Sequence, residues 1–199
     1  MQGKIYLVIG GTRSGKSFFA EQMVEQFSSP VVYIATAEVN DDEMQQRVEL
    51  HQKRRPASWQ TVEEPYQIAK FIRETNLTGK TILLDCLTVY ISNLLWKNSE
   101  ADEEEQKRII FQELGELQEA IIQSGATFVI VSSEVGLGLV PESRLGRLYR
   151  DVVGEANQKI GAAAEEIYFV FAGIPISLKA LQNVNYFEKG IRHGSINNK

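Results

Sequence analysis

Five short apolar runs recur along the chain and predict β-strands. Each run consists almost entirely of aliphatic, β-branched and aromatic residues instead of alternating apolar with polar positions. Continuous apolar runs of this length are typical of strands that are covered on both faces of a sheet. The runs occupy residues 4–10, 31–37, 81–86, 128–134 and 166–174.

Two later segments show a helical period instead. Residues 102–125 begin with four consecutive acidic residues, place apolar side chains three or four positions apart, and end at Gly125. Residues 141–166 repeat the same spacing, and we predict Pro141 at the first helical position. Strand–helix alternation of this kind predicts an α/β fold with a mainly parallel sheet and helices on both faces.

The composition fits one domain spanning residues 1–199. The 199 residues are 43% hydrophobic, so the chain can bury a substantial core without metal or disulfide support. Residues from about 180 to 199 are polar and weakly patterned, and we interpret them as a C-terminal appendage. The net charge of −5 disfavours a nucleic-acid partner, because such binding needs a large basic face.

Cysteine usage and apolar run lengths point to the cytoplasm. Cys86 is the single cysteine, so no intrachain disulfide can form. The N-terminal apolar stretch is too short for a signal peptide, and no run approaches the roughly 20 residues that cross a bilayer. We therefore expect a cytoplasmic protein without a membrane span.

The first predicted strand runs into the sequence GGTRSGKS, which matches the phosphate-binding pattern G-x-x-x-x-G-K-[ST]. Glycines let such a loop wrap phosphates with backbone N–H groups, and the helix that follows adds positive potential. In this pattern the lysine reaches the β- and γ-phosphates, and the serine hydroxyl binds Mg²⁺. The sequence thus predicts a nucleoside-triphosphate site formed by Gly10, Gly11, Thr12, Arg13, Ser14, Gly15, Lys16 and Ser17.

Acidic residues end two further apolar runs. Asp85 lies near the end of the run at 81–86, which we expect to lie beside the first strand, and its carboxylate would hold Mg²⁺ there directly or through water. The alternative is that Asp85 caps the next helix. Glu134 ends the fourth run, where it would orient a substrate or serve as a cap, and both interpretations stay open.

His51 stands directly before a cluster of cations. In a helix running from about Asp42 to Pro56, Arg54 and Arg55 would share a face with the imidazole. These cations would keep the imidazole neutral near pH 7 and would stabilise charge on a phosphate that the ring attacks. A solvated basic turn is the other interpretation, and spacing does not decide between them.

Three arginines recur three positions apart after Pro141. Arg144, Arg147 and Arg150 would either meet phosphates across a subunit boundary or form a solvated helix face or a row of intersubunit salt bridges. The second interpretation is the favoured one.

Four separated motifs closely resemble the bifunctional adenosylcobinamide kinase/adenosylcobinamide-phosphate guanylyltransferase family of cobalamin biosynthesis. They are GGTRSGKSFFAE, YIATAEVNDDEM, RVELHQKRRPASWQTVEEP and the stretch from SSEVGLGLVPESR to FVFAGIPISLK, and the resemblance covers about residues 4–179. It implies a RecA-like P-loop NTPase fold, a homotrimer and adenosylcobinamide as the corrinoid substrate. It also implies phosphorylation of that substrate, followed by transfer of GMP from GTP through a guanylylated histidine.

The resemblance also implies roles for particular residues. The guanylylated histidine falls on His51, which keeps the family's arginine and proline as Arg55 and Pro56. Asp85 stands where many members have glutamate, and a carboxylate one methylene shorter should keep a metal-linked role. Beyond the phosphate loop, the implied nucleotide contacts are Ala35, Thr36, Ala37, Gln52, Lys53, Arg54, Arg55, Glu63 and Asp85.

The resulting hypothesis has GTP and ATP as substrates and Mg²⁺ as the cofactor. His51 would attack the α-phosphorus of GTP, and residues 40–60 would close over the phosphate loop to bring it there. A simple P-loop small-molecule kinase without a covalent step is the main alternative. A regulatory switch or DNA-linked ATPase is another, although the chain lacks the Asn-Lys-x-Asp motif of regulatory GTPases.

Overall fold

A seven-stranded sheet forms the centre of the computed structural model, which describes residues 2–38 and 56–182. The strand order is β3-β2-β4-β5-β1-β6-β7. All neighbouring strands are parallel except β6 and β7, which form an antiparallel pair. The strands are β1 (Lys4–Gly10), β2 (Val31–Ala35), β3 (Gln60–Glu63), β4 (Thr81–Asp85), β5 (Thr127–Ser133), β6 (Glu166–Phe171) and β7 (Ile174–Ser177).

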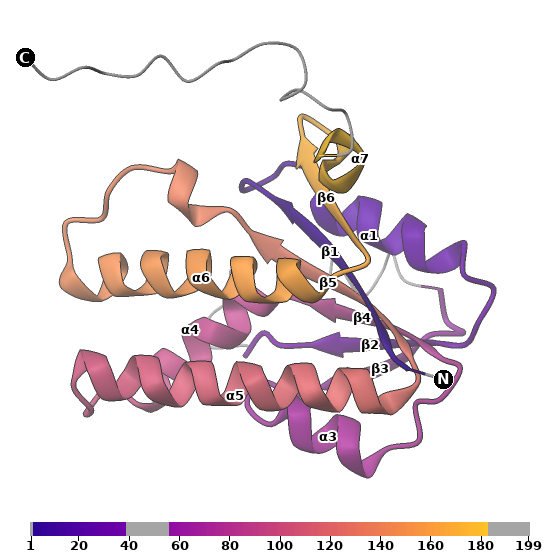
Figure 1. Cartoon of the computed structure of the whole chain (residues 1–199), viewed down its shortest axis with the longest axis horizontal. Helices are drawn as coiled ribbons and strands as arrows, with labels where there is room; N and C mark the ends of the chain where they lie inside the picture. The colour runs from indigo at the N-terminus through magenta and orange to yellow at the C-terminus, as the bar shows by residue number, and fades with distance from the viewer. Residues whose placement is uncertain (1, 39–55, 183–199) are drawn as a thin grey trace, which may run out of the picture.

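Helices cover the two faces of this sheet unequally (Figure 1). On one face, α1 (Lys16–Glu25) packs against the central strands. The other face carries α3 (Ile68–Glu74), α4 (Leu87–Lys97), α5 (Glu103–Ser124) and α6 (Arg144–Ala163). A short 3-10 helix, η1 (Val135–Leu137), follows β5, and α7 (Leu178–Gln182) follows β7. The predicted α/β class with helices on both faces is confirmed.

The two faces correspond to two hydrophobic clusters of different size. In β1, Ile5, Leu7 and Ile9 join the large cluster under α3–α6, whereas Val8 joins the smaller cluster under α1. This alternation is the period-2 geometry of a strand, and both sides are apolar because both faces are covered. The continuous apolar runs in the sequence follow from this arrangement.

The boundaries of α5 agree with the sequence pattern, but those of α6 do not. Asp102 caps α5 by accepting a hydrogen bond from the Glu105 amide at 3.0 Å, and Gly125 ends the helix at a φ of 67°. Pro141 is not the first residue of α6, which begins at Arg144. Ser143 is its N-cap and accepts a hydrogen bond from the Gly146 amide at 3.1 Å, so the serine cap determines where the helix begins.

The fifth apolar run is two strands and not one. Ala172 and Gly173 both have positive φ angles, of 50° and 79°, and they turn the chain back from β6 into β7. Two successive positive φ angles are the mark of a two-residue hairpin turn. The sequence pattern also missed β3, because this four-residue edge strand is mostly exposed and contains no apolar run.

The position of β4 also differs from the expectation. We expected β4 beside β1, but β5 lies between them and pairs with both. All three strands are buried apolar segments, so the hydrophobic pattern identifies each as central without determining which is the neighbour of which. No helix within residues 2–38 and 56–182 combines the length and apolar character that a membrane span requires.

Candidate active site at the carboxyl ends of the strands

The loop between β1 and α1 has a backbone shape that only glycine permits at two positions. A Cβ on Gly10 would stand 2.5 Å from the Val170 carbonyl oxygen and 2.6 Å from the Ser14 Oγ. Gly15 has a φ of 94°, and a Cβ there would stand 3.3 Å from the Cα of Gly173. The glycine spacing of the predicted phosphate loop is therefore a steric requirement of this fold.

Backbone contacts hold the phosphate loop in this shape. The Ser14 amide donates to the Gly11 carbonyl at 3.2 Å, and the Gly173 amide donates to the Ser14 carbonyl at 2.9 Å. The Lys16 ammonium also donates to the Gly11 carbonyl at 3.2 Å, so its charge lies across the loop. Gly15 provides no side-chain cap for α1, which leaves N–H groups of the first helical turn available to an anion.

Asp85 ends β4 on the same edge of the sheet. Its Oδ2 accepts a hydrogen bond from the Tyr33 hydroxyl at 2.8 Å. The N-cap position of α4 is Cys86, so Asp85 itself does not occupy the cap that the sequence left open as an alternative. Burial raises the pKa of the Cys86 thiol and the Asp85 carboxylate raises it further, while the hydrogen bond from the Thr88 hydroxyl lowers it.

The inserted strand β5 determines how Asp85 can act. Alternate strands of a sheet lie about 10 Å apart, so the ends of β1 and β4 are separated by roughly this distance. Helix α1 packs on β4 and β5 as well as on β1, which carries Lys16 and Ser17 toward the end of β4. A water-mediated contact from Asp85 fits this spacing better than a direct bond to an ion held by Ser17.

The donors at this edge suit a metal ion that arrives with a nucleotide. Within the described ranges, no group of three or more His, Cys, Asp or Glu side chains could hold a metal ion alone. Mg²⁺ is usually bound by one or two carboxylates together with phosphate oxygens and waters. The Ser17 hydroxyl and the Asp85 carboxylate are a donor set of this kind.

The ends of β2 and β3 complete the edge. Ala35 is in register with Glu63 on one side and with Asp85 on the other. Thr36, which follows Ala35, is fully buried, and its Oγ1 accepts from the Cys86 amide at 2.8 Å and donates to the Cys86 carbonyl at 2.9 Å. The Thr36 hydroxyl is therefore engaged within the protein, whereas Glu63 is exposed to solvent.

The structure thus gathers predicted site residues from separate strands at one edge. The phosphate loop, Ala35, Thr36, Ala37, Glu63 and Asp85 all lie at or directly after the carboxyl ends of strands. Ligands of open α/β sheets bind at this edge. His51 lies outside the described residues, as do Gln52, Lys53, Arg54 and Arg55, so their roles and the closure of residues 40–60 stay predictions.

Glu134 is tied to the phosphate loop through its backbone. Its amide donates to the Gly10 carbonyl at 3.1 Å, and its side-chain Oε1 lies 3.1 Å from where a Cβ on Gly136 would stand. The carboxylate therefore folds over the start of η1. A contact between this carboxylate and a substrate stays a prediction.

The three arginines at the start of α6 have partners within the chain. Arg144 forms an ion pair with Glu103 on α5, and Arg150 lies 3.7 Å from Asp151. Arg147 donates to the carbonyls of Pro141 and Glu142 at 3.2 and 2.6 Å. These local contacts support the interpretation of the arginines as a helix surface.

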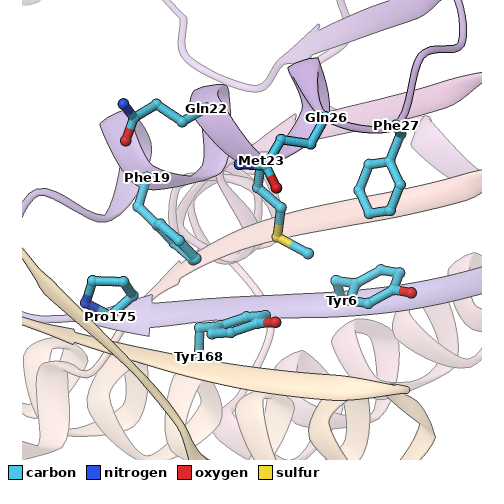
Figure 2. A pocket seen from close by; sticks show the side chains of 8 residues that line it. All are labelled: Tyr6, Phe19, Gln22, Met23, Gln26, Phe27, Tyr168 and Pro175. Atoms are coloured by element: carbon cyan, nitrogen blue, oxygen red, sulfur yellow. The ribbon is translucent and has the colours of Figure 1, made fainter.

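A hollow of about 540 Å³ lies between α1 and the neighbouring strands, away from the predicted site residues (Figure 2). Phe19 and Met23 on α1 point toward Tyr6 and Tyr168 on the strands. Its lining is Tyr6, Phe19, Gln22, Met23, Gln26, Phe27, Tyr168 and Pro175, which includes no predicted site residue.

Sequence patterns did not reveal several side chains and turns that shape the site. Gly173 supports the phosphate loop, and the Ala-Gly dipeptide before β7 was a turn signal that could have located it. Tyr33 holds Asp85 from the adjacent strand, and Asn93 on α4 binds the backbone after β2. No local pattern marks these two residues, because their partners are distant in the sequence.

Comparison with known proteins gives a consistent result. Residues 6–178 match the family model described as cobinamide kinase / cobinamide phosphate guanyltransferase. The chain is 40% identical to the bifunctional adenosylcobalamin biosynthesis protein CobU of Escherichia coli over 179 residues, covering 87% of the chain and 98% of the relative. It is also 40% identical to the bifunctional adenosylcobalamin biosynthesis protein CobP of Pseudomonas aeruginosa, with 87% and 96% covered. The CobU of Salmonella typhimurium is 39% identical, with 87% and 98% covered.

Proposed function

Since the chain belongs to the family of cobinamide kinases and cobinamide phosphate guanyltransferases, we propose that its nucleotide site serves two successive reactions. The first phosphorylates adenosylcobinamide, and the second transfers GMP from GTP to that phosphate to give adenosylcobinamide-GDP. The family resemblance inferred from the sequence motifs is confirmed by the family match. The observation that carries the proposal is the phosphate loop, whose shape requires glycine at two positions, together with Asp85 at the same edge of the sheet.

In the kinase step the chain mainly positions and neutralises phosphates. Backbone N–H groups of the loop and the first turn of α1 would bind the phosphate chain, and the Lys16 ammonium would move from the Gly11 carbonyl to the β- and γ-phosphates. Ser17 and Asp85 would hold Mg²⁺, which neutralises charge on the transferred group. Phosphoryl transfer needs little covalent chemistry from the protein, and ATP or GTP would each suit this loop.

In the guanylyl step His51 would act as a nucleophile. Its imidazole nitrogen would form a bond to the α-phosphorus of GTP as the bond to pyrophosphate breaks. A phosphate oxygen of the corrinoid would then attack the same phosphorus, and the histidine would leave with its electron pair restored. Lys53, Arg54 and Arg55 would stabilise the charge that develops on the phosphate oxygens.

The proposed enzyme is a cytoplasmic homotrimer of single nucleotide-binding domains, with residues from about 180 to 199 as an appendage. Exposed apolar side chains near the β6–β7 hairpin, including Phe171 and Ile174, offer a surface that another subunit would cover. Such a contact would lie beside the phosphate loop, because Gly173 binds Ser14. The single cysteine supports a reducing compartment.

The test is to incubate the protein with GTP labelled at either the α- or the γ-phosphate and to measure label on denatured protein. The covalent step predicts label from the α-position alone, acid-labile and alkali-stable, in the wild type but not in His51→Ala. His193→Ala removes the other histidine of the chain and is the matched control. A wild type that binds GTP without taking α-label would leave a simple P-loop kinase.

A further inference from the structure

The side-chain amide of Asn93 joins two backbone segments that flank residues 39–55. Asn93 lies on α4, and its Nδ2 donates to the Thr36 carbonyl at 2.7 Å and to the Pro65 carbonyl at 3.2 Å. Thr36 follows β2, and Pro65 lies between β3 and α3. One amide group therefore holds the chain on both sides of the segment that contains His51.

A second side-chain contact joins the same two flanks. The Tyr66 hydroxyl donates to the Glu38 Oε2 at 2.8 Å, and this hydrogen bond to a carboxylate raises the pKa of Tyr66. Glu38 is the last described residue before the segment, and Tyr66 follows Pro65 directly. The Lys97 ammonium on α4 lies 5.0 Å from the centroid of the Tyr66 ring. The Tyr66 contact is thus supported from α4 as well.

The flanks are in turn fixed to the end of β4, where Asp85 lies. The Thr36 hydroxyl binds both backbone polar groups of Cys86, and the Thr36 amide donates to the Asp85 carbonyl at 3.3 Å. Asn93, Thr36, Glu38 and Tyr66, which we call the flank clamp, therefore connect the ends of the His51 segment with the end of β4.

We propose that Asn93 is a positioning residue for guanylyl transfer, which it supports by holding both flanks of the segment that carries His51. This inference rests on the proposed covalent step. The Asn93 amide donates to Thr36, one of the implied nucleotide contacts, and to Pro65, and not to the phosphate loop, so binding of the phosphate chain by that loop does not depend on it directly. Misplacement of a reacting group by about 1 Å costs on the order of 100-fold in rate, so losing the amide should affect transfer far more than kinase chemistry.

Two variants of Asn93 and a matched control test this. Asn93→Ala removes the amide, and Asn93→Asp keeps the shape but places a carboxylate against two carbonyl oxygens. Asn98→Ala is the control, because Asn98 is the C-cap residue of α4, is also half-buried, and its side-chain amide donates to the Leu94 carbonyl of the same helix at 2.7 Å. We measure the rate of α-label transfer to protein, the kinase rate with γ-labelled nucleotide, and GTP affinity.

We expect both Asn93 variants to take up α-label about 10- to 100-fold more slowly, with a much smaller change in kinase rate and GTP affinity, because the phosphate loop keeps its own contacts. Asn98→Ala should match the wild type in all three measurements. Equal loss of labelling, kinase rate and GTP affinity in the Asn93 variants would show a merely structural role and would overturn the inference. Labelling at the wild-type rate would overturn it too.

Tyr66→Phe provides a second variant in case the Asn93 variants do not fold. It removes only the hydroxyl that binds Glu38 and keeps the ring beneath Lys97. A smaller decrease in α-labelling, again with a much smaller change in the kinase rate, is expected, and unchanged labelling would contradict the flank clamp. If the wild type itself takes no α-label, the proposed function fails together with this inference, an outcome that differs from failure of the variants alone.

Discussion

The phosphate loop and the flank clamp lie at the same edge of the sheet, but backbone groups hold the first and side chains hold the second. Backbone groups hold the phosphate loop, and its shape depends on glycines within a stretch of the chain that a short sequence pattern describes. Side chains hold the flank clamp, and its contact from Asn93 to Thr36 spans 57 positions. Sterically required glycines can therefore be recognised from sequence, whereas a side-chain clamp becomes visible only once the strands are placed.

The largest expected effect comes from Gly10→Ala, which tests whether the phosphate loop requires glycine at this position. A Cβ at 2.5 Å from the Val170 carbonyl oxygen would force the loop or β6 to move, and backbone cannot yield as a side chain would. We expect GTP affinity to fall about 100-fold or more, as measured by titration calorimetry. Gly115→Ala is the control, because nothing lies within 4 Å of its Cβ position in α5. Wild-type affinity in Gly10→Ala would show that the loop shape is adjustable.

Asp85→Asn tests the point where the two regions meet. The variant keeps the shape of the side chain but removes the charge, so the contribution to Mg²⁺ binding should fall while phosphate contacts remain. We expect the Mg²⁺ concentration required for half-maximal kinase rate to rise about 10- to 100-fold, as for other outer-shell partners of metals. Activity should recover in part at high Mg²⁺. An unchanged Mg²⁺ dependence would exclude Asp85 from the metal site.

Thr36→Val tests the contribution of the flank clamp to the stability of the folded protein. Valine fills the same volume but leaves the Cys86 amide without the acceptor that lies 2.8 Å away. An unsatisfied buried donor costs about 1–3 kcal/mol, so the free energy of unfolding should fall by this amount in urea titrations. Thr36→Ser keeps the hydroxyl and should recover most of the loss. Equal stability of the two variants would mean that the hydroxyl contributes nothing to the clamp.

The smallest effect is a gain, from the control variant Gly115→Ala. Gly115 is an exposed residue within α5 with open space at its Cβ position. Alanine is more favourable than glycine in a helix interior by about 1 kcal/mol, so the melting temperature should rise by a few degrees. A lower melting temperature would indicate that this surface of α5 contacts another subunit at Gly115.

The predicted central strands and the capped helix α5 followed from local patterns. Apolar runs identified β1, β2, β4 and β5, since burial on both faces leaves few polar positions within them. The same pattern could not give the order of β4, β5 and β1, because burial alone does not distinguish neighbours. The prediction that α6 begins at Pro141 was wrong, because the hydrogen bond from the Gly146 amide to the Ser143 side chain determines where the helix begins.

In the candidate site, too, only the residues that belong to a local sequence pattern could be predicted. The glycine and lysine spacing marked the loop between β1 and α1, and the position of Asp85 at a strand end predicted that it lies at the same edge of the sheet as this loop. The sequence could not show that the Thr36 hydroxyl is engaged with Cys86, since these residues meet only through the pairing of β2 with β4. For the same reason Asn93 had no recognisable local signal.

The hairpin turn at Ala172 and Gly173 has a practical consequence for anyone who modifies this chain. Hairpin tips are ordinarily the places where a protein tolerates an inserted epitope or a split site. Here the tip forms one wall of the phosphate loop, because the Gly173 amide binds Ser14 and its Cα adjoins Gly15. An insertion at this outwardly ordinary turn should therefore abolish nucleotide binding in a protein that still folds.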